Sequence, residues 1–127
     1  MLNSIKNISK QYEQAIAYEY GDTANTTDYV TADLDLSSGK NIKSIKVVAG
    51  GKVNNQYGTF DVSLSGGSSY ADIIVSGSGT SANAFNGTVY YLQNTNQYAN
   101  VRYIRASVKG NLSGLSNCTI ALIVTYE

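Results

Sequence analysis

The sequence predicts an all-β protein, a jelly-roll-like antiparallel β-sandwich of about eight strands with an N-terminal arm. Near the C-terminus, residues 98–108 and 118–126 alternate for the length of a long strand, because side chains in a strand switch faces at every residue. The chain has eleven Tyr, no Pro and no Trp, and small polar residues separate its apolar segments. This composition is typical of many strands joined by short turns.

Earlier segments of the chain predict the remaining strands of the sandwich. Residues 29–36 alternate cleanly, which predicts a strand with one buried and one wet face. Further strands are expected at residues 42–48, 60–64, 70–75 and 88–92, and a loop is expected at residues 77–87. Together with the C-terminal pair these make seven strands. Residues 12–20 supply an eighth if they are extended.

The first twenty residues differ from the rest of the chain. Leu2, Ile5, Ile8, Tyr12 and Ile16 recur at steps of three or four, which is the spacing of one helical face. An extended segment over residues 12–20 remains an alternative. We therefore divide the chain into an arm, residues 1–20, and a single sandwich domain, residues 21–127. The arm is expected to order on a neighbouring subunit, the alternative being a frayed terminus.

Composition argues against several classes of function. The nine basic and nine acidic residues are scattered and cancel, so the electrostatic footprint of a nucleic-acid-binding protein is missing. Without His, and with Cys118 as the single cysteine, the chain lacks the usual zinc ligands and the Ser-His-Asp and Cys-His arrangements. No segment approaches the roughly 18 apolar residues of a membrane span. We expect a non-enzyme without catalytic residues, cofactor, metal, nucleic-acid partner or membrane partner.

Three other features of the sequence carry expectations. Cys118 shares a strand face with apolar residues, so its thiol is expected to be buried. Asp33 and Asp35 lie about 7 Å apart on one strand face, within the range of paired-carboxylate glycosidases, but no cleft motif accompanies them, which favours solvated sheet surface. Arg102 and Arg105 are three positions apart and so are expected on opposite faces. Arg102 would face inward and pair with a carboxylate or with backbone carbonyls near the sheet edge, and Arg105 would face outward with Tyr103 as a partner contact.

Two segments resemble a known family. Residues 31–39, TADLDLSSG, and the strand around Arg102, Tyr103, Ile104 and Arg105, followed by residues 112–124, are similar to the small cement or decoration proteins of tailed-bacteriophage capsids, the Bbp16-like group. The resemblance implies a jelly-roll-like protomer, a homotrimer, and a place in the virion on the outer capsid surface, after synthesis in the host cytoplasm. There it would bind the major capsid protein and stabilise its lattice. The residues expected to contact partners are Leu2, Ile5, Ile8, Tyr12, Tyr103 and Arg105.

A second interpretation belongs to another class of function. The excess of Tyr and the Arg-Tyr-Ile-Arg strand, which is similar to one in discoidin-like domains, would suit a carbohydrate-binding sandwich of a phage fibre or surface adhesin. The absence of Trp argues against it. A tail or baseplate accessory protein is a third possibility, which localisation on the particle would distinguish.

Overall fold

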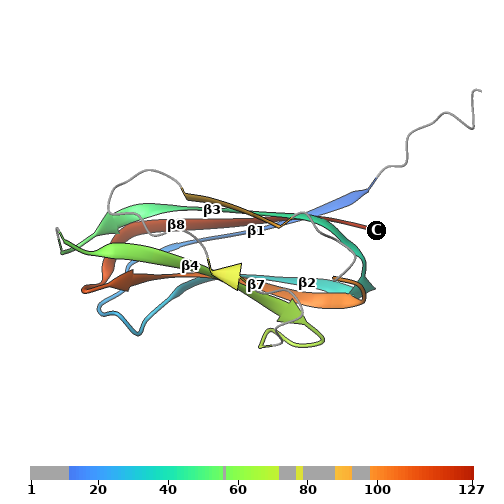
Figure 1. Cartoon of the computed structure of the whole chain (residues 1–127), viewed down its shortest axis with the longest axis horizontal. Coiled ribbons are helices and arrows are strands. Elements are labelled where there is room, and N and C mark those ends of the chain that lie inside the picture. Colours follow the sequence, from blue (N-terminus) through green and yellow to red (C-terminus); the bar gives the residue numbers. More distant parts are fainter. Residues whose placement is uncertain (1–11, 56, 72–76, 79–87, 93–97) are drawn as a thin grey trace, which may run out of the picture.

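The computed structural model describes residues 12–55, 57–71, 77–78, 88–92 and 98–127, which form strands and turns. The strands lie in two antiparallel sheets, which Figure 1 shows edge-on as two layers. One sheet has the order β1-β8-β3-β6 and the other β2-β7-β4-β5. The strands are β1 (Glu13–Gly21), β2 (Val30–Lys40), β3 (Ile42–Val53), β4 (Thr59–Gly67), β5 (Gly77–Ser78), β6 (Thr88–Leu92), β7 (Val101–Asn111) and β8 (Leu115–Tyr126).

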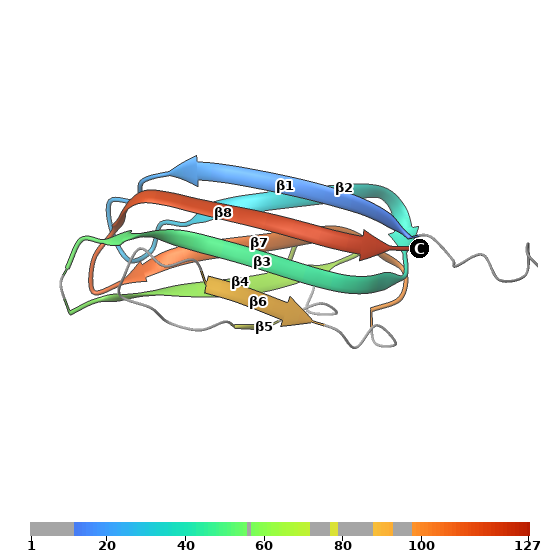
Figure 2. The ribbon, with the colours of Figure 1, turned by 90° about the horizontal axis from the view of Figure 1, so that it is seen from above.

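The prediction of an all-β antiparallel sandwich is confirmed, with a difference in the lengths of its strands. Each sheet is built on three long strands of 9 to 12 residues, whereas β5 has 2 residues and β6 has 5. These two short strands lie at the sheet margins (Figure 2). The sandwich is thus a framework of six long strands rather than eight strands of similar length. In the described part of the chain, no helix is long and apolar enough to cross a membrane.

The core lies between the two sheets and follows from alternation along the strands. In β8, Cys118, Ile120, Leu122 and Val124 are at most 1% exposed, and they face Ile104, Ala106 and Val108 of β7 among other inward side chains. The expectation that Cys118 is buried is confirmed. Because burial disfavours the thiolate, the pKa of Cys118 rises to about 11. This cysteine therefore behaves as a small apolar side chain.

The boundary expected between arm and sandwich is wrong. Residues 13–20 belong to the sandwich, since β1 pairs with β8 from Glu13 opposite Tyr126 to Gly21 opposite Cys118. Ala15 and Ala17 pack against the core, while the side chain of Ile16 is 60% exposed. The extended alternative for this segment is thus correct, and the sandwich begins at Glu13. Leu2, Ile5 and Ile8 lie outside the described residues.

The strand expected at residues 70–75 is not found in the two residues of this range that the structure describes. Tyr70 and Ala71 lie in a turn after β4, and residues 72–76 lie outside the described residues. Gly66 and Gly67 end β4. Gly67 has a φ of 152°, a backbone conformation that residues other than Gly rarely adopt. The hydroxyl of Ser65 then donates to the carbonyl oxygen of Tyr70 at 2.7 Å, which holds the turn back over the sheet.

The assigned core predicts that replacing a buried aromatic residue by Ala destabilises the fold much more than replacing an exposed one. Phe60, in β4, is 1% exposed, whereas Tyr57, in the turn before it, is 78% exposed. Phe60→Ala should lower the free energy of unfolding by about 3–5 kcal/mol, because it removes apolar contacts and leaves a cavity. Tyr57→Ala should change it by less than about 0.5 kcal/mol. Urea denaturation of both variants measures this, and equal losses would contradict the assigned core.

Candidate functional site

The outer face of the β2-β7-β4-β5 sheet carries a group of charged and aromatic side chains that contact one another. The register places Asp33 opposite Arg105 and Asp35 opposite Tyr103 across β2 and β7. Tyr70 reaches the same face from the turn after β4, where its ring contacts Tyr103. We call this group the Arg–Tyr cluster; its members are Asp33, Asp35, Tyr70, Arg102, Tyr103 and Arg105.

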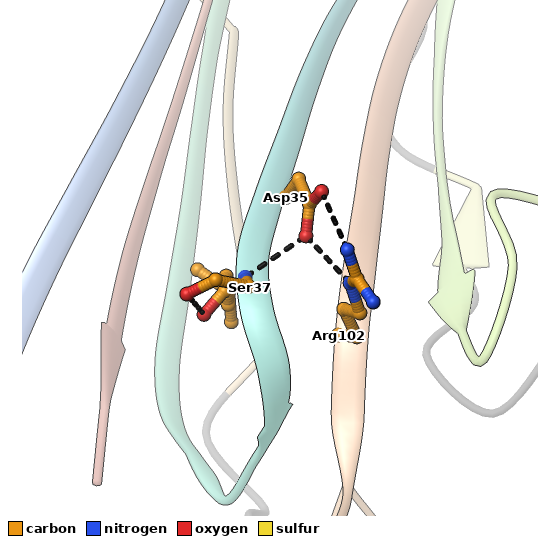
Figure 3. A network of polar contacts seen from close by, with 4 residues as sticks. Asp35, Ser37 and Arg102 are labelled. Carbon is orange, nitrogen blue, oxygen red and sulfur yellow. Dashed lines mark hydrogen bonds and ion pairs between the residues drawn. The ribbon is translucent and has the colours of Figure 1, made fainter.

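Two bidentate ion pairs cross from β2 to β7 in this cluster. Arg105 donates from Nε to Asp33 Oδ1 and from Nη2 to Asp33 Oδ2, both at 2.8 Å. Arg102 donates from Nε to Asp35 Oδ1 at 2.9 Å and from Nη2 to Asp35 Oδ2 at 3.2 Å (Figure 3). This parallel arrangement fixes the orientation of both guanidinium groups. Because all four side chains are 35–43% exposed, the pairs orient side chains more than they stabilise the fold.

The two tyrosines of the cluster pack against each other and against the arginines. The ring centroids of Tyr70 and Tyr103 are 4.9 Å apart, with the rings tilted by 58°. Arg105 Cζ lies 4.7 Å from the centroid of Tyr70, and Arg102 Cζ lies 4.8 Å from that of Tyr103, which are cation–π distances. Partial burial raises the pKa of the Tyr70 hydroxyl, so it stays protonated and available as a donor.

The expectation that Arg102 faces the core is wrong. Alternation in β7 breaks between Val101 and Ile104, which are both buried although they are three positions apart. The pairing of β2 with β7 is irregular between Asp35 and Lys40. Ser37, within this irregularity, has a φ of 67°, and its N–H donates to Asp35 Oδ1 at 2.9 Å (Figure 3). Arg102 therefore joins Arg105 in one patch.

The paired carboxylates are not arranged for acid–base chemistry. Asp33 and Asp35 are each engaged by a guanidinium, as described above. The hydrogen bonds from Arg102 lower the pKa of Asp35, with a further contribution from the Ser37 N–H, so this carboxyl group is a poor proton donor near neutral pH. In the described part of the chain, no group of three or more His, Cys, Asp or Glu side chains could hold a metal ion. Both carboxylates therefore hold guanidinium groups in place on the outer face of the sheet.

The structure separates the other residues expected to contact partners. Tyr103 and Arg105 are in the cluster, but Tyr12 precedes β1 on the other sheet, where it is 45% exposed and Lys43 Nζ lies 5.6 Å from its ring centroid. Tyr70, Asp33, Asp35 and Arg102 also belong to the cluster, although their sequence positions did not predict a partner contact for them. The signal that could have found the aspartates is their spacing of two, which matches the spacing of Tyr103 and Arg105 on the paired strand.

Comparison with known proteins shows the fold of the chain. No known protein family and no curated protein matches the sequence. Solved structures that match include the VP2 subviral particle of infectious bursal disease virus, with a TM-score of 0.56, 8% identity, and coverage of 94% of this chain and 38% of that one. The T13 particle of the same virus matches with a TM-score of 0.54, 8% identity, and coverage of 94% and 36%. The chain thus spans less than two fifths of these viral capsid proteins, with which it shares a β-sandwich.

A chitosan-binding module from a Paenibacillus chitosanase/glucanase also matches, at a TM-score of 0.40 and 12% identity, with coverage of 85% of this chain and 75% of that one. A similarity of this size carries no information about a ligand for this chain.

The ion pair between Asp35 and Arg102 predicts a pH-dependent effect on stability. Because Asp35 has a lowered pKa in the folded protein, its contribution is fully present above its ordinary value of 3.8 and is lost as the pH falls through the lowered value. Asp35→Asn should therefore lower the melting temperature at pH 7, and the difference from the wild type should shrink below pH 3.8. Thermal melts between pH 7 and pH 2 measure this, with Asp28→Asn, in an exposed loop, as control. A difference that is equal at every pH would contradict the assignment.

Proposed function

We propose that the protein is a capsid decoration, or cement, protein that binds the outer surface of a tailed-phage head and stabilises the lattice of major capsid subunits. The observation that carries this proposal is the preorganised Arg–Tyr cluster, exposed on one face of a sandwich whose fold is shared with viral capsid proteins. A protein of this kind needs a rigid framework and distributed contacts, and it needs neither a catalytic group nor a cofactor.

The strand order supports assignment of the sandwich as a jelly roll. The order β1-β8-β3-β6 facing β2-β7-β4-β5 takes the chain from one sheet to the other at every connection except that between β4 and β5. Double-sheet jelly rolls of eight strands are used in viral capsid domains and in lectins. This topology places the Arg–Tyr cluster on one broad surface and β1 on the other, so two partners can be bound at once.

Tyr103 and Arg105 are the proposed centre of the capsid contact. Arg and Tyr are enriched among the residues that dominate binding energy. Here their side chains are already oriented by Asp33 and Tyr70, so less conformational freedom is lost on binding. Association as a homotrimer, with Leu2, Ile5, Ile8 and Tyr12 of the arm contacting neighbours, would multiply a modest single contact into firm attachment.

A carbohydrate-binding module of a phage fibre or surface adhesin is the second candidate. The observation that favours it is the same cluster, because tyrosine rings and oriented Arg and Asp side chains also suit the apolar faces and hydroxyls of sugars. Binding on a glycan array would favour this candidate if Tyr103→Ala abolishes it and if capsid binding is absent.

Co-sedimentation with phage heads tests the proposal. The purified chain is mixed with heads assembled from the major capsid protein encoded nearest to its gene. The wild type should co-sediment, and Arg105→Ala and Tyr103→Ala should each weaken binding by about tenfold or more, the effect of losing a central contact. Melting temperatures should stay close to that of the wild type for Arg105→Ala.

Tyr57→Ala is the matched control for co-sedimentation, because Tyr57 is 78% exposed and lies outside the cluster. Failure of the wild type to bind heads, or equal binding by Arg105→Ala, Tyr103→Ala and Tyr57→Ala, would overturn the proposal.

A further inference from the structure

Around β1, the outer face of the β1-β8-β3-β6 sheet is more apolar than a solvated sheet face usually is. Figure 2 looks onto this sheet, with β1 at its margin. Ile16, Tyr18 and Tyr20 of β1 are 59–60% exposed. The register places Ile123 beside Ile16, and Ala121 beside Tyr18, with Val48 of β3 next in that row. We call these outward-facing residues the tyrosine face: Ile16, Tyr18, Tyr20, Val48, Ala121 and Ile123.

The size of the tyrosine face fits a short segment of chain better than a whole protein surface. A tyrosine can bury about 150–250 Å², so each of its two tyrosines leaves on the order of 100 Å² exposed. With Ile16 and its neighbours the face offers a few hundred Å², which is the size of the largest apolar patch on a typical monomer, a patch that often has a function. A standard protein–protein interface buries about 800 Å² on each partner, roughly twice as much.

Charge at the margin of this face complements the N-terminal segment of the chain. Glu13 and Glu19 lie on β1, which is the edge strand of its sheet, and Glu19 is exposed. Residues 1–11 contain Lys6 and Lys10 and no acidic residue, and their apolar side chains include Leu2, Ile5 and Ile8. The segment thus has apolar side chains that can pack on the tyrosine face and positive charge that complements the two glutamates, while on the far side of the face Lys46 of β3 lies beside Ile123.

The length and attachment point of this segment favour binding between copies. Its eleven residues reach about 36–40 Å when extended, more than the roughly 30 Å of a nine-residue strand such as β1. The segment joins β1 at its first residue, so it would have to reverse direction to lie along its own strand. Residues 9–12, Ser-Lys-Gln-Tyr, contain no Gly, Pro, Asn or Asp, so Ser9 is the one residue among them that favours a tight turn.

We infer that the tyrosine face binds residues 1–11 of a second copy of the chain. Each copy then gives its segment to one neighbour and receives a segment from another, which is a head-to-tail arrangement that closes into a ring such as a trimer. The inference rests on the self-association proposed above, but it does not depend on the capsid as partner. It leaves the Arg–Tyr cluster, on the opposite sheet, free for that partner.

Sedimentation velocity of three variants tests the inference. The wild type should be oligomeric, whereas deletion of residues 1–11 and Tyr18→Lys should each yield a monomer at the same concentration. Tyr29→Lys is the matched control, because Tyr29 is 53% exposed and lies outside the tyrosine face. It should leave the oligomer unchanged. Circular dichroism melts of each variant report whether the sandwich is folded.

Disulfide cross-linking of the full-length chain gives a test that does not depend on the deletion. A preparation of Ile8→Cys is mixed with a preparation of Tyr18→Cys, and oxidation should produce a mixed dimer at least tenfold more abundant than with Tyr29→Cys in place of Tyr18→Cys. The native thiol is buried and should not compete.

Each result of these experiments has a defined meaning. An oligomer that survives both the deletion and Tyr18→Lys would overturn the inference while leaving self-association intact. A monomeric wild type that binds a labelled peptide of residues 1–11 only after deletion of its own segment would show that the segment folds back on its own chain, which overturns binding between copies. Loss of head binding with an intact oligomer would instead count against the proposed capsid function.

Discussion

The two sheets hold together through the apolar layer between them, and the rest of the structure depends on that contact. β7 and β8 lie in the interior of their sheets, and their inward side chains, such as Ile104 and Leu122, are fully buried. Because neighbouring residues of a strand point to opposite faces, burying one set determines which residues face outward. The two outer faces therefore follow from the core, and they differ: one carries paired charges and tyrosines, and the other carries isoleucine and tyrosine around β1, with Lys46 beside Ile123.

The parts of the fold that could be predicted from the sequence are those in which alternation is unbroken. In β8 the alternation predicted both the strand and the burial of Cys118. The end of the arm was misplaced for a simple numerical reason: Tyr12 and Ile16 are four apart, and a step of four keeps residues together on a strand face as well as on a helical one. Pairing with β8 favours the strand over the helix, because the backbone at the edge of β8 needs hydrogen-bond partners and β1 provides them.

The site was predictable only in part, because local backbone irregularities determine it. The period of two in a strand predicts that Arg102 and Arg105 point to opposite faces. That prediction holds only for a strand without irregularities. The left-handed conformation at Ser37, stabilised by the Asp35 carboxylate, shifts the pairing of β2 with β7. Asp35 thus has two roles. It stabilises the irregularity through Ser37, and it binds Arg102, which the irregularity turns to the surface. Tyr70 was assigned to a strand over residues 70–75, whereas it lies in the turn that follows Gly66 and Gly67.

A structure of the assembled protein, determined by cryo-electron microscopy at side-chain resolution, tests the central claim most directly. That claim is that the two outer faces have separate partners. The account predicts that a neighbouring copy covers Tyr18 and Ile123 in the free oligomer, while Arg102, Tyr103 and Arg105 remain exposed to solvent. An oligomer in which copies meet through the Arg–Tyr cluster, with Ile16, Tyr18 and Tyr20 open to solvent, would contradict it.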